Sequence, residues 1–169
     1  FKAGTATVKA AETAALDQHV WVGAGQYPEA PWFTGGSFLV ARRISMTIET
    51  WDHQSLRDQE NIFGRSKAEG APLSGGDEFT AIDFAMKGRG GPPIVDAPSH
   101  VSLAHPSHNH GVRMLRRGYN FVDGSTHLGR LDAGLFFIAF VNDPTTHYIP
   151  MQTAMAKNDL LVEYLRHTG

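Results

Sequence analysis

The sequence predicts an α+β fold. Three stretches have the apolar pattern of β-strands, and two others have the capping signals and length of helices. Their order along the chain is strand, helix, long loop, strand, strand, helix. A chain of 169 residues is long enough to bury the core of one domain. We therefore expect one domain in which a sheet packs against helices.

The first strand is expected over residues 37–48, where apolar side chains alternate with polar ones. The apolar face of this strand consists of Phe38, Val40, Ile44, Met46 and Ile48. A helix is expected over residues 51–63, capped by Thr50 and ended by Gly64. This part of the chain therefore predicts one strand followed by one helix.

Residues 64–111 are polar and rich in glycine and proline, which predicts a long loop. Loops of this length inside a compact domain are usually functional. A second strand is expected over 112–122 and a third, buried strand over 133–141. The long loop is thus expected to carry functional residues in front of two strands.

The C-terminal part predicts a helix from Pro150, with Asn158 or Asp159 capping a continuation that runs to Gly169. A split βαβ, ferredoxin-like unit needs one more strand after its last helix. We therefore expect a chain truncated at its end, or a strand supplied from elsewhere. The chain begins with Phe1 and shows no basic segment followed by an apolar one, so no signal peptide is expected in it.

Composition excludes several classes of function. The net charge of −2 gives no general attraction to nucleic acid or to anionic membranes, so neither is expected as a partner. The longest apolar run, 133–141, is too short to span a bilayer. Without cysteine, the chain has no disulfide and no thiolate ligand for a metal.

Residues 100–111 read HVSLAHPSHNHG and contain four histidines. Histidine is the commonest metal ligand and a proton shuttle near neutral pH. For His105, His108 and His110 the sequence favours solvated loop side chains, because no acidic residue or cysteine lies near enough to complete a local metal site. His100 precedes the apolar Val101 and is expected to point inward. It is either a ligand or a buried histidine with a satisfied hydrogen bond.

The pair Arg116-Arg117 lies in an expected strand, where successive side chains point to opposite faces. One of the two guanidinium groups is therefore expected to face inward, where it needs an anionic partner. That partner is either a carboxylate of the protein, in a structural salt bridge, or an anion, a propionate or a developing oxyanion in a cavity.

Taken together, these segments resemble a known family. The resemblance runs through GGSFLVARRISMTIETWD, GRSKAEGAPLSGG, the stretch from His100 to Pro106, MLRRGYNFVDG, AGLFFIAFVND and HYIPMQTAMAKNDLLVEYLRHTG. In order and spacing, they resemble the C-terminal half of the dye-decolorising (DyP-type) haem peroxidases. The closest branch is the secreted one that includes bacterial deferrochelatase/peroxidases.

The resemblance implies a ferredoxin-like haem-binding module of the dimeric α+β barrel type. Residues 1–169 would be the C-terminal haem-binding portion, apparently truncated at both ends. It implies haem b as cofactor, His100 as the axial ligand of the iron and Arg116 as the distal arginine. The other expected haem contacts are Gly4, Thr5, Ala6, His105, Pro106, Ser107, Leu135 and Phe137.

The chain departs from the family pattern in three places. Ala3 stands where the family has its catalytic aspartate, within the motif Phe1-Lys2-Ala3-Gly4-Thr5, and Ser102 stands where an arginine usually follows the ligand. The linker before His100 reads DAPSHVS, where the family usually has DAHVR. A distal carboxylate can move a proton between the two oxygens of peroxide. With an alanine there, we expect the chain to bind haem but to react slowly with peroxide.

The activity implied is a haem peroxidase that uses hydrogen peroxide to oxidise dyes, phenols and other bulky aromatic donors. The partners implied include the missing N-terminal half of the same protein, and a homo-oligomeric assembly is left open. The family branch implies a secreted or periplasmic location.

Two alternatives remain. One is a haem-binding, deferrochelatase-like iron-handling protein with little peroxidase turnover, which Ala3 favours. The other is an α+β dimerisation module without a cofactor, because fold alone does not determine function. Dye oxidation with peroxide separates the enzyme from the haem-handling protein, and a colourless protein would favour the dimerisation module.

Overall fold

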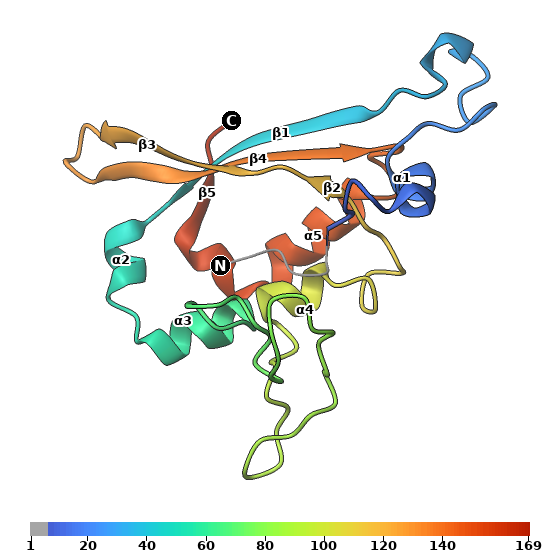
Figure 1. The fold of residues 1–169 in the computed structure, drawn as a ribbon. Coiled ribbons are helices and arrows are strands. Elements are labelled where there is room, and N and C mark those ends of the chain that lie inside the picture. The colour runs from blue at the N-terminus through green and yellow to red at the C-terminus, as the bar shows by residue number, and fades with distance from the viewer. Residues whose placement is uncertain (1–6) are drawn as a thin grey trace.

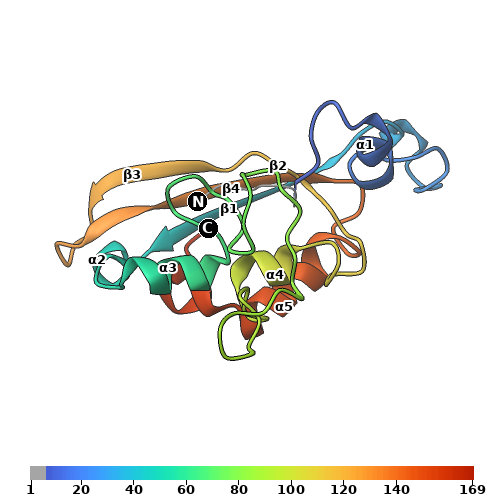
Figure 2. The same ribbon diagram turned by 60° about the horizontal axis from the view of Figure 1, so that its bottom comes forward.

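A computed structural model describes residues 7–169 of the chain. Within this range, an antiparallel sheet carries helices on one of its faces, and α1 (Thr13–His19) lies at one end of the sheet (Figures 1 and 2). The expectations for Ala3, Gly4, Thr5 and Ala6 lie outside the described residues. The predicted α+β class is confirmed.

The two longest strands, β1 (Phe38–Met46) and β4 (Leu131–Val141), pair along eight residues each, from Phe38 opposite Val141 to Ser45 opposite Gly134. The other strands of the described sheet are β2 (Leu115–Arg116), β3 (Tyr119–Ser125) and β5 (Leu165–His167). Both β2 and β3 pair with β4, whereas β5 pairs with β1. β4 therefore lies between β1 on one side and β2 and β3 on the other.

The helices form a layer on one face of the sheet (Figure 1). It contains α2 (Ile48–Asp52), α3 (Leu56–Phe63), α4 (His100–Ala104) and α5 (Tyr148–Asn158). Figure 2 shows α3, α4 and α5 side by side beneath the sheet. Short 3₁₀ turns occur at η1 (Pro31–Phe33) and η2 (Leu160–Tyr164). No helix in residues 7–169 has the length and apolar character needed to cross a membrane.

Two apolar clusters join the helices to the sheet. The first contains Ala104, Met114, Ala139, Val141 and Met151. The second contains Trp51, Leu161 and Tyr164, where the Trp51 and Tyr164 rings meet edge to face with centroids 5.1 Å apart. Members of both clusters also line one cavity, which therefore lies between them.

The helix expected over 51–63 is in fact two helices. Thr50 lies inside α2, and a second start occurs at Ser55, whose hydroxyl accepts a hydrogen bond from the Asp58 N–H at 3.2 Å. Ser55 therefore caps α3, a role the sequence analysis had assigned to Thr50. The predicted stop is confirmed, because Gly64 adopts φ 79° as the left-handed C-cap of α3.

Two other segments are more broken than expected. The loop over 64–111 contains α4, which begins at His100. The strand expected over 112–122 is divided into β2 and β3 by Arg117-Gly118. The sequence therefore located both segments, the loop by its composition and the strand by its residue pattern, but did not show their interruptions.

The expectation of a missing last strand was wrong. The helix from Tyr148 ends at Asn158, and Asp159 caps the 3₁₀ turn η2, accepting from the Leu161 N–H at 2.9 Å. The chain then becomes extended, and β5 pairs antiparallel with Ile44–Met46 of β1. The last strand of the ferredoxin-like unit is therefore β5, formed by residues that were expected to be helical.

Candidate functional site

A cavity of about 550 Å³ lies between the sheet and the helices. Cavities of this size accommodate organic cofactors and drug-sized ligands. The sheet side of the wall includes Ile44, Met46, Ala133, Leu135 and Phe137. The helix side includes Phe63, His100, Ala104, Tyr148, Met151 and Met155. The wall is therefore largely apolar, with a few polar groups at defined places.

His100 is the first residue of α4 and contributes its ring to the cavity wall. Its Nδ1 lies 2.7 Å from Oδ2 of Asp159, a side chain that is almost completely buried. The ring also packs edge to face against Phe63, with centroids 5.6 Å apart. Because Nδ1 is engaged by the carboxylate, Nε2 is the nitrogen through which His100 can bind a metal.

Asp159 is held through both of its carboxylate oxygens. Oδ1 accepts the Leu161 N–H at 2.9 Å, and Oδ2 faces His100. The residue is 5% exposed. The sequence predicts Asp159 only as a possible cap and gives no sign of its contact with His100, because the two residues are 59 positions apart. An aspartate before an apolar run signals only a cap.

Arg116 lies on β2 opposite Ala139 of β4 and also lines the cavity. Its main-chain N–H donates to the Thr7 hydroxyl at 3.2 Å. Within residues 7–169, its buried Nε has no hydrogen-bond partner, and none of the ion pairs seen there includes it. Burial lowers the pKa of the guanidinium, and the positive charge of Arg65 lowers it further.

Arg116 is therefore the inward-facing member of the arginine pair, whereas Arg117 is exposed. A buried guanidinium with an unpaired N–H is suited to an anion that enters the cavity. The described part of the chain offers no structural salt bridge to this side chain, which was the other expectation.

The other expected contacts divide into two groups. Leu135 and Phe137 both line the cavity, as two residues on one face of β4. His105, Pro106 and Ser107 follow α4 and do not contribute to the cavity wall, where Ala104 is the last residue of that segment. The Nδ1 of His105 instead lies 2.9 Å from the Ser107 hydroxyl. These three remain predictions.

Of the four histidines in residues 100–111, His100 alone lines the cavity. The ring of His108 packs on Phe84, with centroids 4.4 Å apart, and its Nδ1 lies 3.0 Å from the Ser102 hydroxyl. Burial lowers the pKa of His105, which also packs against Phe84. No group of three or more ligating side chains occurs among residues 7–169.

Tyr148, Gln152 and His167 also line the cavity, and the sequence analysis did not identify them. The Tyr148 hydroxyl accepts from Arg42 Nη1 at 3.3 Å and donates to Gln152 Oε1 at 3.4 Å. Tyr148 and Gln152 are four residues apart on α5, so they share a face of that helix. Only the helix boundary, which lies two residues before the expected Pro150, brings Tyr148 into the helix.

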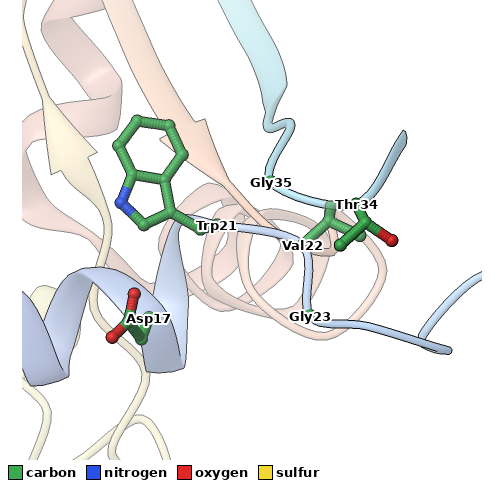
Figure 3. A pocket seen from close by; sticks show the side chains of 6 residues that line it. All are labelled: Asp17, Trp21, Val22, Gly23, Thr34 and Gly35. Atoms are coloured by element: carbon green, nitrogen blue, oxygen red, sulfur yellow. The ribbon is translucent and has the colours of Figure 1, made fainter. Parts of the chain in front are cut away.

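A second hollow, of about 470 Å³, lies near α1. It is lined by Asp17, Trp21, Val22, Gly23, Thr34 and Gly35 (Figure 3). Its wall has one carboxylate and no imidazole or guanidinium group. The cavity at His100 is therefore the better candidate for chemistry.

Comparisons with known proteins agree with this geometry. A family model described as "Dyp-type peroxidase, C-terminal" matches residues 1–169. A dye-decolorizing peroxidase of Thermobifida fusca is 39% identical over 143 residues, which is 84% of this chain and 33% of that protein. A deferrochelatase of Escherichia coli K12 is 35% identical over 171 residues, which is 100% of this chain and 40% of that protein.

Among solved structures, an oxyferrous complex of DtpA from Streptomyces lividans superposes with a TM-score of 0.89 at 35% identity. The match covers 98% of this chain and 44% of DtpA. The chain thus spans less than half the length of the proteins it resembles.

Proposed function

The chain belongs to the Dyp-type peroxidase family, and from this membership we propose that it forms the haem-binding part of a peroxidase. In this proposal the cofactor is haem b and His100 binds the iron through Nε2. The observation that carries the proposal is the pair formed by His100 and the buried Asp159 at the wall of the large cavity.

The residues present fit a haem group. The cavity is wide and mainly apolar, which suits a porphyrin ring. It offers an imidazole whose second nitrogen is held by a carboxylate, as metal-binding histidines usually are. Its wall also includes the cation Arg116, which suits an anion or a polarised oxygen.

When bound, the haem iron supplies the redox chemistry, reducing peroxide and accepting electrons one at a time from a donor. The protein residues prepare this chemistry. Asp159 accepts a hydrogen bond from the Nδ1–H group of His100, which fixes the tautomer and makes the imidazole a stronger donor to iron. Arg116 is placed to stabilise negative charge on a peroxide oxygen.

The cavity wall limits access of water to the reacting oxygens. Leu135 and Phe137 supply apolar surface on the sheet side. Exclusion of water strengthens the effect of the Arg116 charge, because the local dielectric constant is lower than in bulk solvent. This part of the proposal assigns Leu135 and Phe137 to the peroxide side of the haem.

We propose hydrogen peroxide as the oxidant and dyes, phenols and other bulky aromatic compounds as donors. The name of the Thermobifida fusca relative supports this choice of donors. We further propose that the complete protein contains an N-terminal half that joins this one and that it works outside the cytoplasm. Its homo-oligomeric state stays open.

Ala3 carries a second part of the proposal, which rests on sequence alone. An alanine at the distal aspartate position leaves peroxide without its proton shuttle, while Arg116 remains. The Ala3→Asp variant is expected to react with peroxide about a hundred- to ten-thousand-fold faster in rapid-mixing experiments. An unchanged rate in this variant would contradict the assignment of Ala3.

An iron-handling role is the alternative function. It is supported by Ala3 and by the deferrochelatase that aligns with the whole chain. One experiment separates the two functions: the purified full-length protein is loaded with haemin, and its absorption spectrum is followed after one equivalent of peroxide and a dye. A spectral change accompanied by dye oxidation, even a slow one, supports the peroxidase. Release of iron with little dye oxidation supports the alternative.

A further inference from the structure

One edge of the large cavity carries polar side chains that the proposed mechanism does not use. His167 of β5 lines the cavity and is also exposed, so it lies where the cavity opens to solvent. Gln152 of α5 lines the cavity too and is half-buried. Apolar groups such as Met155 belong to the same wall. This edge is therefore open to a small aromatic compound that approaches from outside.

Strand pairing places His167 on the sheet side of the cavity. His167 lies opposite Ile44 of β1, and Ile44 lies opposite Leu135 of β4. Paired residues of neighbouring strands point to the same face of a sheet, and all three of these residues line the cavity. His167 therefore lies on the face to which the proposed function assigns the peroxide.

A series of hydrogen bonds orients Gln152. Arg42 Nη1 donates to the Tyr148 hydroxyl at 3.3 Å, and this hydroxyl donates to Gln152 Oε1 at 3.4 Å. Arg42 Nε also donates at 3.4 Å to the main-chain oxygen of Gly169, two residues after His167, so Arg42 connects β5 with α5. Within residues 7–169, Gln152 Nε2 has no hydrogen-bond partner. Its N–H groups are therefore available to an oxygen atom of a ligand.

The imidazole of His167 is suited to accept a proton. Among the described residues, its ring nitrogens form no hydrogen bond and no ion pair. Partial burial lowers the pKa of His167, and the positive charge of Arg42 lowers it further, so the ring is neutral near pH 7. A neutral imidazole has one nitrogen that accepts. Because the residue is exposed, a proton taken up there can pass on to solvent.

We propose that His167 takes the proton of a phenolic electron donor, while Gln152 donates a hydrogen bond to the phenol oxygen. The inference rests on the proposed function and assigns residues to one class of its donors. In this step the O–H bond of the phenol breaks. The proton passes to a ring nitrogen of His167, one electron passes to the haem group that peroxide has oxidised, and the phenol becomes a phenoxyl radical. Two such steps supply the two electrons and two protons that convert one peroxide into two waters.

The kinetic test compares a phenol, guaiacol, with the dye ABTS, which loses an electron but no proton. Each is given with peroxide to the full-length, haem-loaded protein. His167→Leu is expected to lower kcat/KM for guaiacol about a hundredfold, the contribution of a positioned base, and to leave kcat/KM for ABTS unchanged. In ping-pong kinetics this quantity does not contain the peroxide step, so a slow reaction with peroxide does not hide the effect.

His127→Leu is the matched control, because His127 is exposed and does not line the cavity. It should keep the native kcat/KM for both donors. An equal loss for guaiacol and ABTS in His167→Leu, or no loss for either, would overturn the role of His167.

A binding test needs no turnover. Guaiacol and its methyl ether, veratrole, are titrated by calorimetry into the haem-loaded protein without peroxide. The native protein is expected to bind guaiacol about two- to tenfold more tightly, because only guaiacol has a hydroxyl that donates to His167. His167→Leu should lose this preference, and Gln152→Leu should weaken the binding of both compounds. Equal affinities of the native protein for the two compounds would overturn the inference.

Circular dichroism reports whether each variant is folded. If His167→Leu is unfolded, His167→Gln takes its place, because glutamine keeps a hydrogen bond but accepts no proton. That variant should still prefer guaiacol in the binding test and should lose the guaiacol activity. If the loaded protein oxidises neither donor, the proposed function fails, and calorimetry still decides whether His167 and Gln152 bind a phenol.

Discussion

His100 and Asp159 act as one unit at the wall of the cavity. The carboxylate is fixed by the main chain of η2, and the imidazole is fixed by the carboxylate. A metal ligand oriented in this way loses little conformational freedom when it binds, and the negative charge behind it raises its basicity. The strength of the bond from His100 to iron is therefore expected to depend on Asp159.

Replacement of Asp159 by asparagine tests this dependence. Asp159→Asn keeps an oxygen for the Leu161 N–H but removes the negative charge behind His100. We expect haem affinity to fall by about 10- to 100-fold, and the reduction potential of the bound iron to rise. Haemin titration and spectroelectrochemistry measure the two effects.

Asp96→Asn is the control for that experiment, because Asp96 is an exposed carboxylate four residues before His100. It should leave both quantities unchanged. An Asp159→Asn protein with native affinity and native potential would show that the carboxylate serves only as a cap for η2.

At the scale of elements, the junction between α3 and α4 positions His100. Gly64 ends α3 with φ 79°, and a Cβ atom there would overlap Val101 and press on Ser99 and Val95. Gly129 has a similar φ of 73°, but a Cβ atom there would meet nothing within 4 Å. Replacing each glycine by alanine therefore separates two costs. Backbone strain arises at both positions, whereas overpacking arises only at Gly64.

Gly129→Ala is expected to cost about 1–2 kcal/mol in the free energy of unfolding, because alanine is strained in the left-handed region. Gly64→Ala is expected to cost about 1–3 kcal/mol more, because it also overpacks the junction. Urea unfolding of both variants measures the difference. Equal losses would mean that α3 and α4 are not tightly packed at this point.

The elements also show where a sequence reading succeeds. Alternation of apolar residues located β1, and an unbroken apolar run located most of β4. The two helices over 48–63 were read as one, because the turn at 53–55 interrupts the pattern for too few residues to be visible. The sequence predicted a helix at β5 because the three residues of this strand are held extended only by pairing with β1. That pairing is a tertiary contact.

The sequence predicted some residues of the site and not others. His100, Arg116, Leu135 and Phe137 were expected to meet, and all four line one cavity. Asp159 could not be found, because it owes its role to a contact made by the folded chain. Its partner His100 lies 59 positions away in the sequence.

At the scale of the whole molecule, buried and half-buried histidines make stability depend on pH. Burial lowers the pKa values of His19, His105 and His147 below the usual value of 6.5. In the unfolded chain these imidazoles take up protons near pH 6.5, before the folded chain does. Their contribution is therefore complete above this pH and is lost as the pH falls through the lowered folded values.

We expect the free energy of unfolding of the apo-protein to decrease from pH 7.5 to pH 5, as measured by urea titration. His147→Gln should reduce the decrease, because His147 lies 3.1 Å from His19 and the two cannot both be protonated without repulsion. The negative charge of Asp143 raises the pKa of His147 and so opposes the lowering by burial. The remaining histidines should therefore retain part of the pH dependence in this variant. A stability that is flat over this range would contradict the account.

The central claim is that His100 binds haem iron, and one measurement tests it most directly. The full-length protein and its His100→Ala variant are titrated with haemin, and the Soret region is recorded with and without added imidazole. We predict that the variant loses the spectrum of a histidine-bound haem and that imidazole restores it, while His108→Ala behaves as the native protein. A His100→Ala protein whose haem spectrum and affinity match the native protein would contradict the claim.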